Sequence, residues 1–210
     1  MDEVEIVRNR KAIIDYFKAQ DILILNQVRG NKIVDADDNF IIEPEADGSI
    51  TTKRNLVLAI QTADCVPVLL ASGDGKIIGA AHCGWQGSIA NIIDNIIIGM
   101  QNKGAKNIIA VIAPAIAQES YEVDEKYYKA FLDKDINNKQ FFINSKKENH
   151  YMFDLPKFVE SKLRETGVKN IKNISEDTYA NSIKYPSYRR ATHTQIPHKE
   201  NILSTIIIKK

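Results

Sequence analysis

Cysteine is scarce in this chain, which has 2 in 210 residues, and two cysteines cannot form the disulfide framework of a small secreted domain. An excess of charge of either sign is also missing, because 28 basic and 27 acidic side chains leave a formal net charge of +1. Without such an excess, no global field draws the protein to nucleic acid or to an anionic membrane. We therefore expect neither as a partner.

Long apolar runs are absent as well. The stretch Ile92–Met100 is interrupted by Asp94 and Asn95 and is too short to span a bilayer. The first eight residues lack the basic and then apolar layout of a signal peptide. These absences predict a cytoplasmic protein, and we favour a monomer.

The scarce residue types gather in one stretch, residues 62–88. There Cys65 lies in Thr-Ala-Asp-Cys-Val-Pro, and His82 and the sole tryptophan, Trp85, lie in Ala-His-Cys-Gly-Trp-Gln-Gly-Ser. Strand-like segments over 55–60 and 76–81 directly precede these two polar motifs. A thiolate and an imidazole at the ends of neighbouring strands suit a metal or nucleophilic chemistry, so the sequence predicts an enzyme.

The hydrophobic pattern mixes helical and strand periods along the whole chain. It predicts helices over 4–20, 87–101, 124–132 and 154–166, and strands over 22–28, 32–34, 55–60, 66–70, 76–81, 107–113, 171–174 and 202–208. Residues 72–75 are expected to form a hairpin turn, and residues 35–49 a connection. With no repeat and no low-complexity linker, we expect one α+β domain over 1–210.

The chain carries a set of short motifs, namely Thr62–Val68, His82–Gly87, Glu45–Asp47 with Thr51, Pro114–Ile116 with Tyr121–Val123, and Ser187–Arg190. They resemble the motifs of the YfiH-like family, a laccase-domain or polyphenol oxidase family that includes purine nucleoside phosphorylases. These motifs occur in the right order, with plausible gaps, along nearly the whole chain. The chain looks shortened at its N-terminus relative to the family.

The resemblance implies a layered α/β/β/α fold with mixed sheets. It also implies a zinc-dependent purine nucleoside phosphorylase that uses phosphate and acts on inosine, adenosine or methylthioadenosine, with adenosine deaminase activity in the same pocket. Zinc would be held by Cys65, by His82 and by a histidine at the position where this chain has Arg29. Arginine offers only donors and a positive charge, so it cannot replace that ligand.

The candidate site combines residues of the motifs with residues that suit phosphate or purine. We expect Cys65, His82 and Asp64 to be catalytic, and Arg29, Gly84, Gln86 and Arg189 to bind substrate. Asp64 is as readily interpreted as a structural cap of a turn. Cys83 is a candidate additional metal ligand if the chain turns at 82–84, and the other three histidines are expected on the surface or in loops.

Two alternatives remain at this stage. One is a metal-free Cys–His hydrolase, similar to deamidating toxins, in which Arg29 lowers the pKa of the Cys65 thiol. The other is a catalytically degraded relative that keeps the fold and a binding surface. Laccase chemistry is not expected, because a multicopper cluster needs about ten imidazoles and the chain has 4 histidines.

Overall fold

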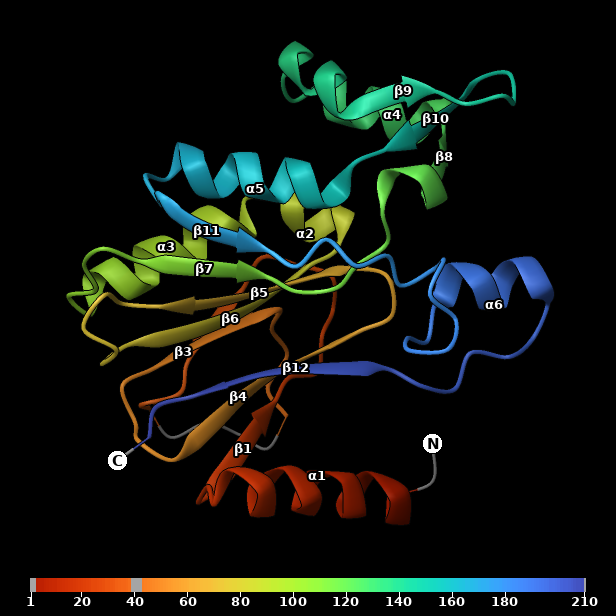
Figure 1. Cartoon of the computed structure of the whole chain (residues 1–210). Helices are drawn as coiled ribbons and strands as arrows, with labels where there is room; N and C mark the ends of the chain where they lie inside the picture. Colours follow the sequence, from red (N-terminus) through yellow and green to blue (C-terminus); the bar gives the residue numbers. More distant parts are fainter. Residues whose placement is uncertain (1–2, 39–42, 210) are drawn as a thin grey trace.

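The computed structural model describes residues 3–38 and 43–209. Its larger sheet has six strands and is mixed (Figure 1). In spatial order these are β11 (Asn170–Asn173), β7 (Ile109–Ile112), β5 (Val66–Ala71), β6 (Ile78–Cys83), β3 (Gly48–Thr51) and β2 (Ile33–Asp35). The two outer pairs, β11 with β7 and β2 with β3, are parallel, and the pairs between them are antiparallel.

A second sheet of three strands packs against the first. It contains β1 (Asp21–Ile24), β4 (Leu56–Thr62) and β12 (Ile202–Ile207), with β4 in the centre. Leu58 and Ile60 of β4 pack with Ile78 and Ala80 of β6 in one apolar cluster between the sheets. Because both faces of β4 are covered, its residues 56–60 are all buried, and this part of the strand is continuously apolar.

Helices cover the two outer faces, which completes four layers in the order α/β/β/α (Figure 1). On the larger sheet lie α2 (Trp85–Ile89), α3 (Ile92–Asn102) and α5 (Leu155–Glu165). On the smaller sheet lies α1 (Glu3–Phe17), whose Ile13, Ile14 and Phe17 pack against Val57 and Ala59. The predicted α+β class with layered mixed sheets is confirmed.

A third, small sheet carries an aromatic cluster beside these layers. It comprises β8 (Glu122–Asp124), β10 (His150–Phe153) and β9 (Phe142–Asn144), next to α4 (Glu125–Leu132) and two 3₁₀ helices, Gln118–Ser120 and Ile136–Phe141. Phe131 and Phe153 are fully buried there, with ring centroids 4.7 Å apart. The remaining helix, α6 (Tyr188–Thr194), lies apart near the end of the larger sheet (Figure 1).

Most predicted elements are present, and the differences have local causes. The expected helix over 87–101 is two helices, because Asn91 adopts a left-handed conformation with φ 67° between α2 and α3. The strand expected over 22–28 ends at Ile24, since residues 28–30 form a turn around a buried carboxylate. The expected connection over 35–49 contains the start of β3, and the short strands β8–β10 were not predicted.

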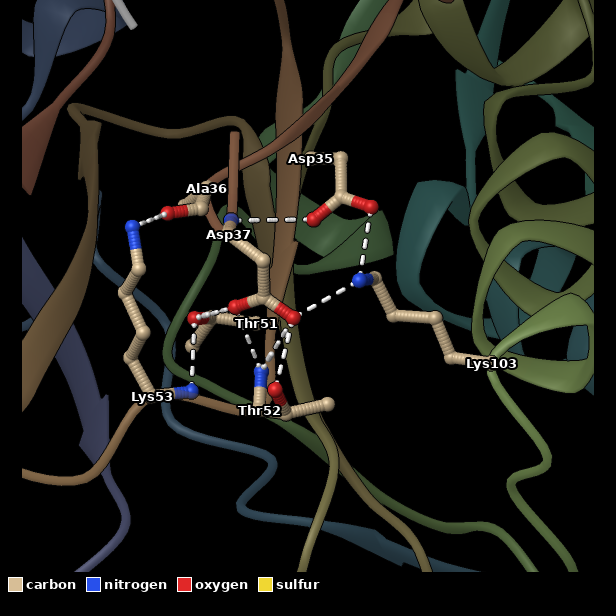
Figure 2. Close-up of polar contacts among 7 residues, drawn as sticks. All are labelled: Asp35, Ala36, Asp37, Thr51, Thr52, Lys53 and Lys103. Atoms are coloured by element: carbon tan, nitrogen blue, oxygen red, sulfur yellow. Dashed lines mark hydrogen bonds and ion pairs between the residues drawn. The ribbon is translucent and has the colours of Figure 1, made fainter. Parts of the chain in front are cut away.

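A polar network joins the C-terminal ends of β2, β3 and α3 (Figure 2). The carboxylate of Asp37 accepts hydrogen bonds from Thr51 Oγ1 at 2.6 Å, from the Thr52 backbone N–H at 2.9 Å and from Lys103 Nζ at 2.7 Å. Asp35 pairs with the same ammonium group at 2.7 Å. The network fixes the C-terminal end of β3 against β2 and against the C-terminal end of α3.

This network predicts a specific acid sensitivity of the fold. Partial burial would raise the pKa of Asp37, but hydrogen bonds from Lys103, Thr51 and Thr52 lower it below its ordinary value. Asp37 therefore stabilises the fold above about pH 4, where the carboxyl is ionised even in the unfolded chain, and this contribution is lost as the pH falls further. We expect Asp37→Asn to lower the free energy of unfolding at pH 7 by about 1 kcal/mol.

Urea unfolding of both proteins at several pH values measures this difference, which should shrink as the pH falls below 4. The control is Asp38→Asn, which makes the same change at the exposed neighbouring position. It should leave the unfolding free energy unchanged at every pH. An Asp37→Asn difference that stayed constant down to pH 2 would contradict the assignment.

Candidate functional site

A cavity of about 620 Å³ opens where the polar ends of β4, β5 and β6 meet. All seven residues that the sequence predicts for the site line it, namely Arg29, Asp64, Cys65, His82, Gly84, Gln86 and Arg189. They come from the turn after β1, the β4–β5 connection, the end of β6, the start of α2, and α6. A second cavity of about 590 Å³ beside α5 contains none of them.

Cys65 and His82 approach each other above Gly84. A Cβ atom added to Gly84 would lie 3.4 Å from Cys65 Sγ and 3.5 Å from His82 Nε2, so the glycine leaves open the space that both groups border. Burial would lower the pKa of His82, but its hydrogen bonds to Asp47 and Cys65 raise it to about 9. The thiol itself is half-buried at the cavity wall.

Asp47 lies behind His82 and was not predicted as a site residue. Its fully buried carboxylate accepts a hydrogen bond from His82 Nδ1 at 2.8 Å and three more from the backbone N–H groups of Val28, Arg29 and Gly30. Three successive N–H groups around one anion form a nest. Burial would raise the pKa of Asp47, but the hydrogen bonds from His82 and Gly30 lower it.

On its other side, the turn over residues 28–30 packs closely against α2 at Gly87. A Cβ atom at Gly87 would lie 2.5 Å from the carbonyl oxygen of Gly30, closer than atoms can pack. Glycine at this position therefore lets α2 approach the turn. Arg29 adopts a left-handed conformation with φ 61° at the tip of the turn, and its side chain is exposed at the cavity.

Asp64 connects the β4–β5 loop to the C-terminal part of the chain. Its carboxylate accepts hydrogen bonds from Thr178 Oγ1 at 2.7 Å, from Ser187 Oγ at 2.9 Å and from the Arg189 backbone N–H at 2.6 Å. These three donors leave little room for proton transfer at the same oxygens. The geometry therefore favours a structural role for Asp64 over a catalytic one. The carboxylate does not cap a local turn, however, because its donors lie more than 100 residues further along the chain.

The guanidinium group of Arg189 lies over the ring of Tyr121, 5.0 Å from its centroid, and donates to the carbonyl oxygen of Glu122 at 2.6 Å. The stacking and the hydrogen bond orient a cation at the cavity. Arg190 differs, because its guanidinium group donates to the carbonyl oxygens of Thr178, Tyr179 and Tyr185. Only the first arginine of the pair lines the cavity.

Several other residues line the cavity that were not predicted for the site, although some of them lie in the motifs named above. Trp85, Tyr121 and Tyr188 add aromatic surface, and His198 and Asn201 reach the cavity from the segment between α6 and β12. His198 is a loop histidine as expected, but it lines the cavity and pairs through Nε2 with Asn201 Oδ1 at 3.1 Å. Thr62 also lines the cavity, and among the described residues its buried hydroxyl has no hydrogen-bond partner.

Cys83 does not join the candidate metal ligands. It follows His82 on the same strand, so its side chain points to the opposite face of the sheet, where it is fully buried in the main apolar cluster. Burial raises the pKa of its thiol far above the ordinary value. The turn at 82–84 that ligation would need is absent, because β6 continues through Cys83.

The donors at the cavity do not complete a zinc site. Among residues 3–38 and 43–209, no group of three or more His, Cys, Asp and Glu side chains is placed to hold a metal ion. Catalytic zinc normally has three protein ligands, whereas the cavity offers only Cys65 and His82 of the expected set. Arg29, at the position where the family resemblance implies the third ligand, offers donors only. We therefore derive no chemical step through zinc.

Comparison with known proteins identifies the lineage. Residues 2–197 match a family model described as multi-copper polyphenol oxidoreductase laccase. The chain is 72% identical over 209 residues to a Rickettsia conorii protein named purine nucleoside phosphorylase, with 100% of this chain and 87% of that protein covered. It is 30% identical over 166 residues to the Escherichia coli protein named purine nucleoside phosphorylase YfiH, covering 79% and 67%.

Solved structures agree with the fold. The crystal structure of the Bacillus licheniformis protein YfiH superimposes with a TM-score of 0.88 at 26% identity, covering 99% of this chain and 82% of that one. A Neisseria meningitidis protein gives a TM-score of 0.87 at 25% identity, covering 97% and 81%. No helix in the described part of this chain is long and apolar enough to cross a membrane. By the model match over residues 2–197 and the Rickettsia relative, the chain belongs to the family described as multi-copper polyphenol oxidoreductase laccase.

Proposed function

We propose that this protein is a purine nucleoside phosphorylase acting on inosine, adenosine or methylthioadenosine with inorganic phosphate. The names of its relatives support this class of reaction. The observation that carries the proposal is the convergence of Cys65, His82 and Arg189 on one cavity with aromatic walls. A cavity of about 620 Å³ has room for a nucleoside beside a phosphate.

Phosphorolysis requires a held phosphate and a protonated leaving group. A phosphate oxygen attacks C1′ of the ribose, the bond from C1′ to the purine nitrogen breaks, and the purine takes the electron pair and a proton. We assign Arg29 and Arg189 to the phosphate, since guanidinium groups bind its oxygens in a bidentate manner. We assign His82 to the proton, because Asp47 occupies Nδ1 and leaves Nε2 toward the cavity.

The remaining cavity residues fit supporting roles. Gly84 leaves the reaction space open, the amide of Gln86 and the hydroxyl of Thr62 suit polar groups of the nucleoside, and the aromatic side chains suit its base. We place Cys65 beside the ribose, paired with His82. We assign Asp64 to the positioning of Arg189, because the three hydrogen bonds of its carboxylate go to the C-terminal segment that carries this arginine.

Adenosine deamination in the same cavity, a cytoplasmic location and a monomeric state stay predictions. A second candidate function is a metal-free hydrolase. It is favoured by the alignment of Cys65, His82 and Asp47, in which a thiol meets an imidazole that a carboxylate orients, as in a catalytic triad. Assay of nucleosides and of small esters and amides separates these functions, and absence of all turnover identifies a degraded relative.

The two cysteines provide a matched test of the site. We expect Cys65→Ala to lower kcat/KM for inosine phosphorolysis by about 100-fold or more, because it removes the group paired with His82. Cys83→Ala deletes the same atom from the apolar core and should retain the turnover of the parent, with a lower melting temperature. Release of hypoxanthine, followed by absorbance, measures both. Equal activities of the two variants would contradict the assignment of Cys65.

The donor set predicts weak zinc binding. We expect protein purified without chelator to contain well under one zinc per chain, and phosphorolysis to resist a chelator, because two protein ligands bind zinc poorly. Arg29→His restores an imidazole at the third position and should raise the zinc content toward one per chain. Elemental analysis measures both proteins. One tightly held zinc per chain in the unaltered protein would contradict this prediction.

A further inference from the structure

We propose that Asp47 is a positioning residue that holds the imidazole of His82 and the Arg29 turn in one fixed arrangement. Its effect on turnover rests on the proposed phosphorolysis, but the arrangement itself does not. The carboxylate connects His82 with Arg29, two cavity residues that lie 53 positions apart in the sequence and on different elements. No sequence pattern singled out Asp47 for this purpose.

The hydrogen bonds of Asp47 are divided between its two oxygens. Oδ1 accepts from His82 Nδ1 at 2.8 Å and from the Arg29 N–H at 2.9 Å. Oδ2 accepts from the Gly30 N–H at 2.6 Å and from the Val28 N–H at 3.2 Å. Because a carboxylate has about four acceptor positions and Asp47 is fully buried, it has no oxygen to offer to substrate or metal. Asp47 therefore acts through its neighbours.

The backbone of Asp47 is held as firmly as its side chain. Its carbonyl oxygen accepts from the His82 N–H at 2.7 Å, and its own N–H donates to Lys32 at 3.1 Å. It directly precedes β3, which is paired with β6 on one side and β2 on the other. A residue in this place keeps its orientation when substrate enters.

Asparagine cannot reproduce the arrangement, although it has the same shape. Its amide has one accepting oxygen and one donating NH₂ group. Whichever way the amide is oriented, the NH₂ group faces two donors, either His82 with Arg29 or Gly30 with Val28. Asp47→Asn therefore releases the imidazole or loosens the turn.

The experiment compares Asp47→Asn with Asp37→Asn, which makes the same change in another carboxylate that accepts several hydrogen bonds, outside the cavity. We expect Asp47→Asn to lower kcat by about 10- to 100-fold or more and to raise KM for phosphate by about tenfold. Arg29→Gln should raise KM for phosphate alone. Asp37→Asn should change neither constant at a temperature where both variants are folded.

A measurement without substrate tests the arrangement directly. In histidine-labelled protein, the shielded Nδ1–H of His82 should give a slowly exchanging downfield proton resonance, because it donates to a buried carboxylate. The resonance should persist in Asp37→Asn and be shifted or lost in Asp47→Asn. His82→Ala assigns it.

The outcomes separate the two proposals. If the unaltered protein shows the resonance but cleaves no purine nucleoside, the proposed function fails and the positioning by Asp47 is supported. If phosphorolysis is present and folded Asp47→Asn keeps kcat and KM within about twofold, the positioning role is overturned. Should Asp47→Asn not fold, absence of the resonance in the unaltered protein overturns the proposal, and its presence supports it.

Discussion

The carboxylate of Asp47 is fully buried and satisfied by four N–H donors, and the geometry of the cavity depends on it. A buried charge is stable only where hydrogen bonds replace the water it has lost. Here the replacements are the His82 ring and the backbone of the Val28–Gly30 turn. The requirement to solvate one anion thus orients a chemical group and shapes the loop that presents Arg29.

The layered fold brings the partners of this anion together. Asp47 lies at the start of β3, His82 near the end of the neighbouring antiparallel strand β6, and Gly87 in the helix that follows, close against the turn. Asp64 performs a comparable role on the other side of the cavity, where its carboxylate binds the C-terminal segment and fixes Arg189. Two buried aspartates therefore assemble the cavity from several separate stretches of chain.

The departures at the cavity follow from the same geometry. Arg29 lies where the family resemblance implies an imidazole, and the backbone that carries it is held by Asp47 irrespective of its side chain. The replacement therefore changes the chemistry of the cavity without disturbing the fold. Cys83 is the reverse case: as the neighbour of His82 on an extended strand it points into the core, where it contributes packing.

The sequence alone was sufficient for the α+β class, for most helices and strands, and for the expectation that Cys65 and His82 lie together, as they do at one cavity. Apolar runs such as residues 56–60 report burial on both faces, and the scarce residue types cluster at strand ends, so both signals are local. The sequence did not predict the short strands β8–β10, because they are stabilised by an aromatic cluster whose residues come from several segments.

Tertiary structure alone decided the hydrogen-bond partners of Asp47 and Asp64, the break at Asn91 and the aromatic wall that includes Tyr121 and Tyr188. These features depend on hydrogen bonds and contacts between residues as many as 125 positions apart, as between Asp64 and Arg189. Residue type and spacing carry local information about periodicity and turns. Which donors meet a buried carboxylate is settled only when the layers pack, because only then is water excluded from it.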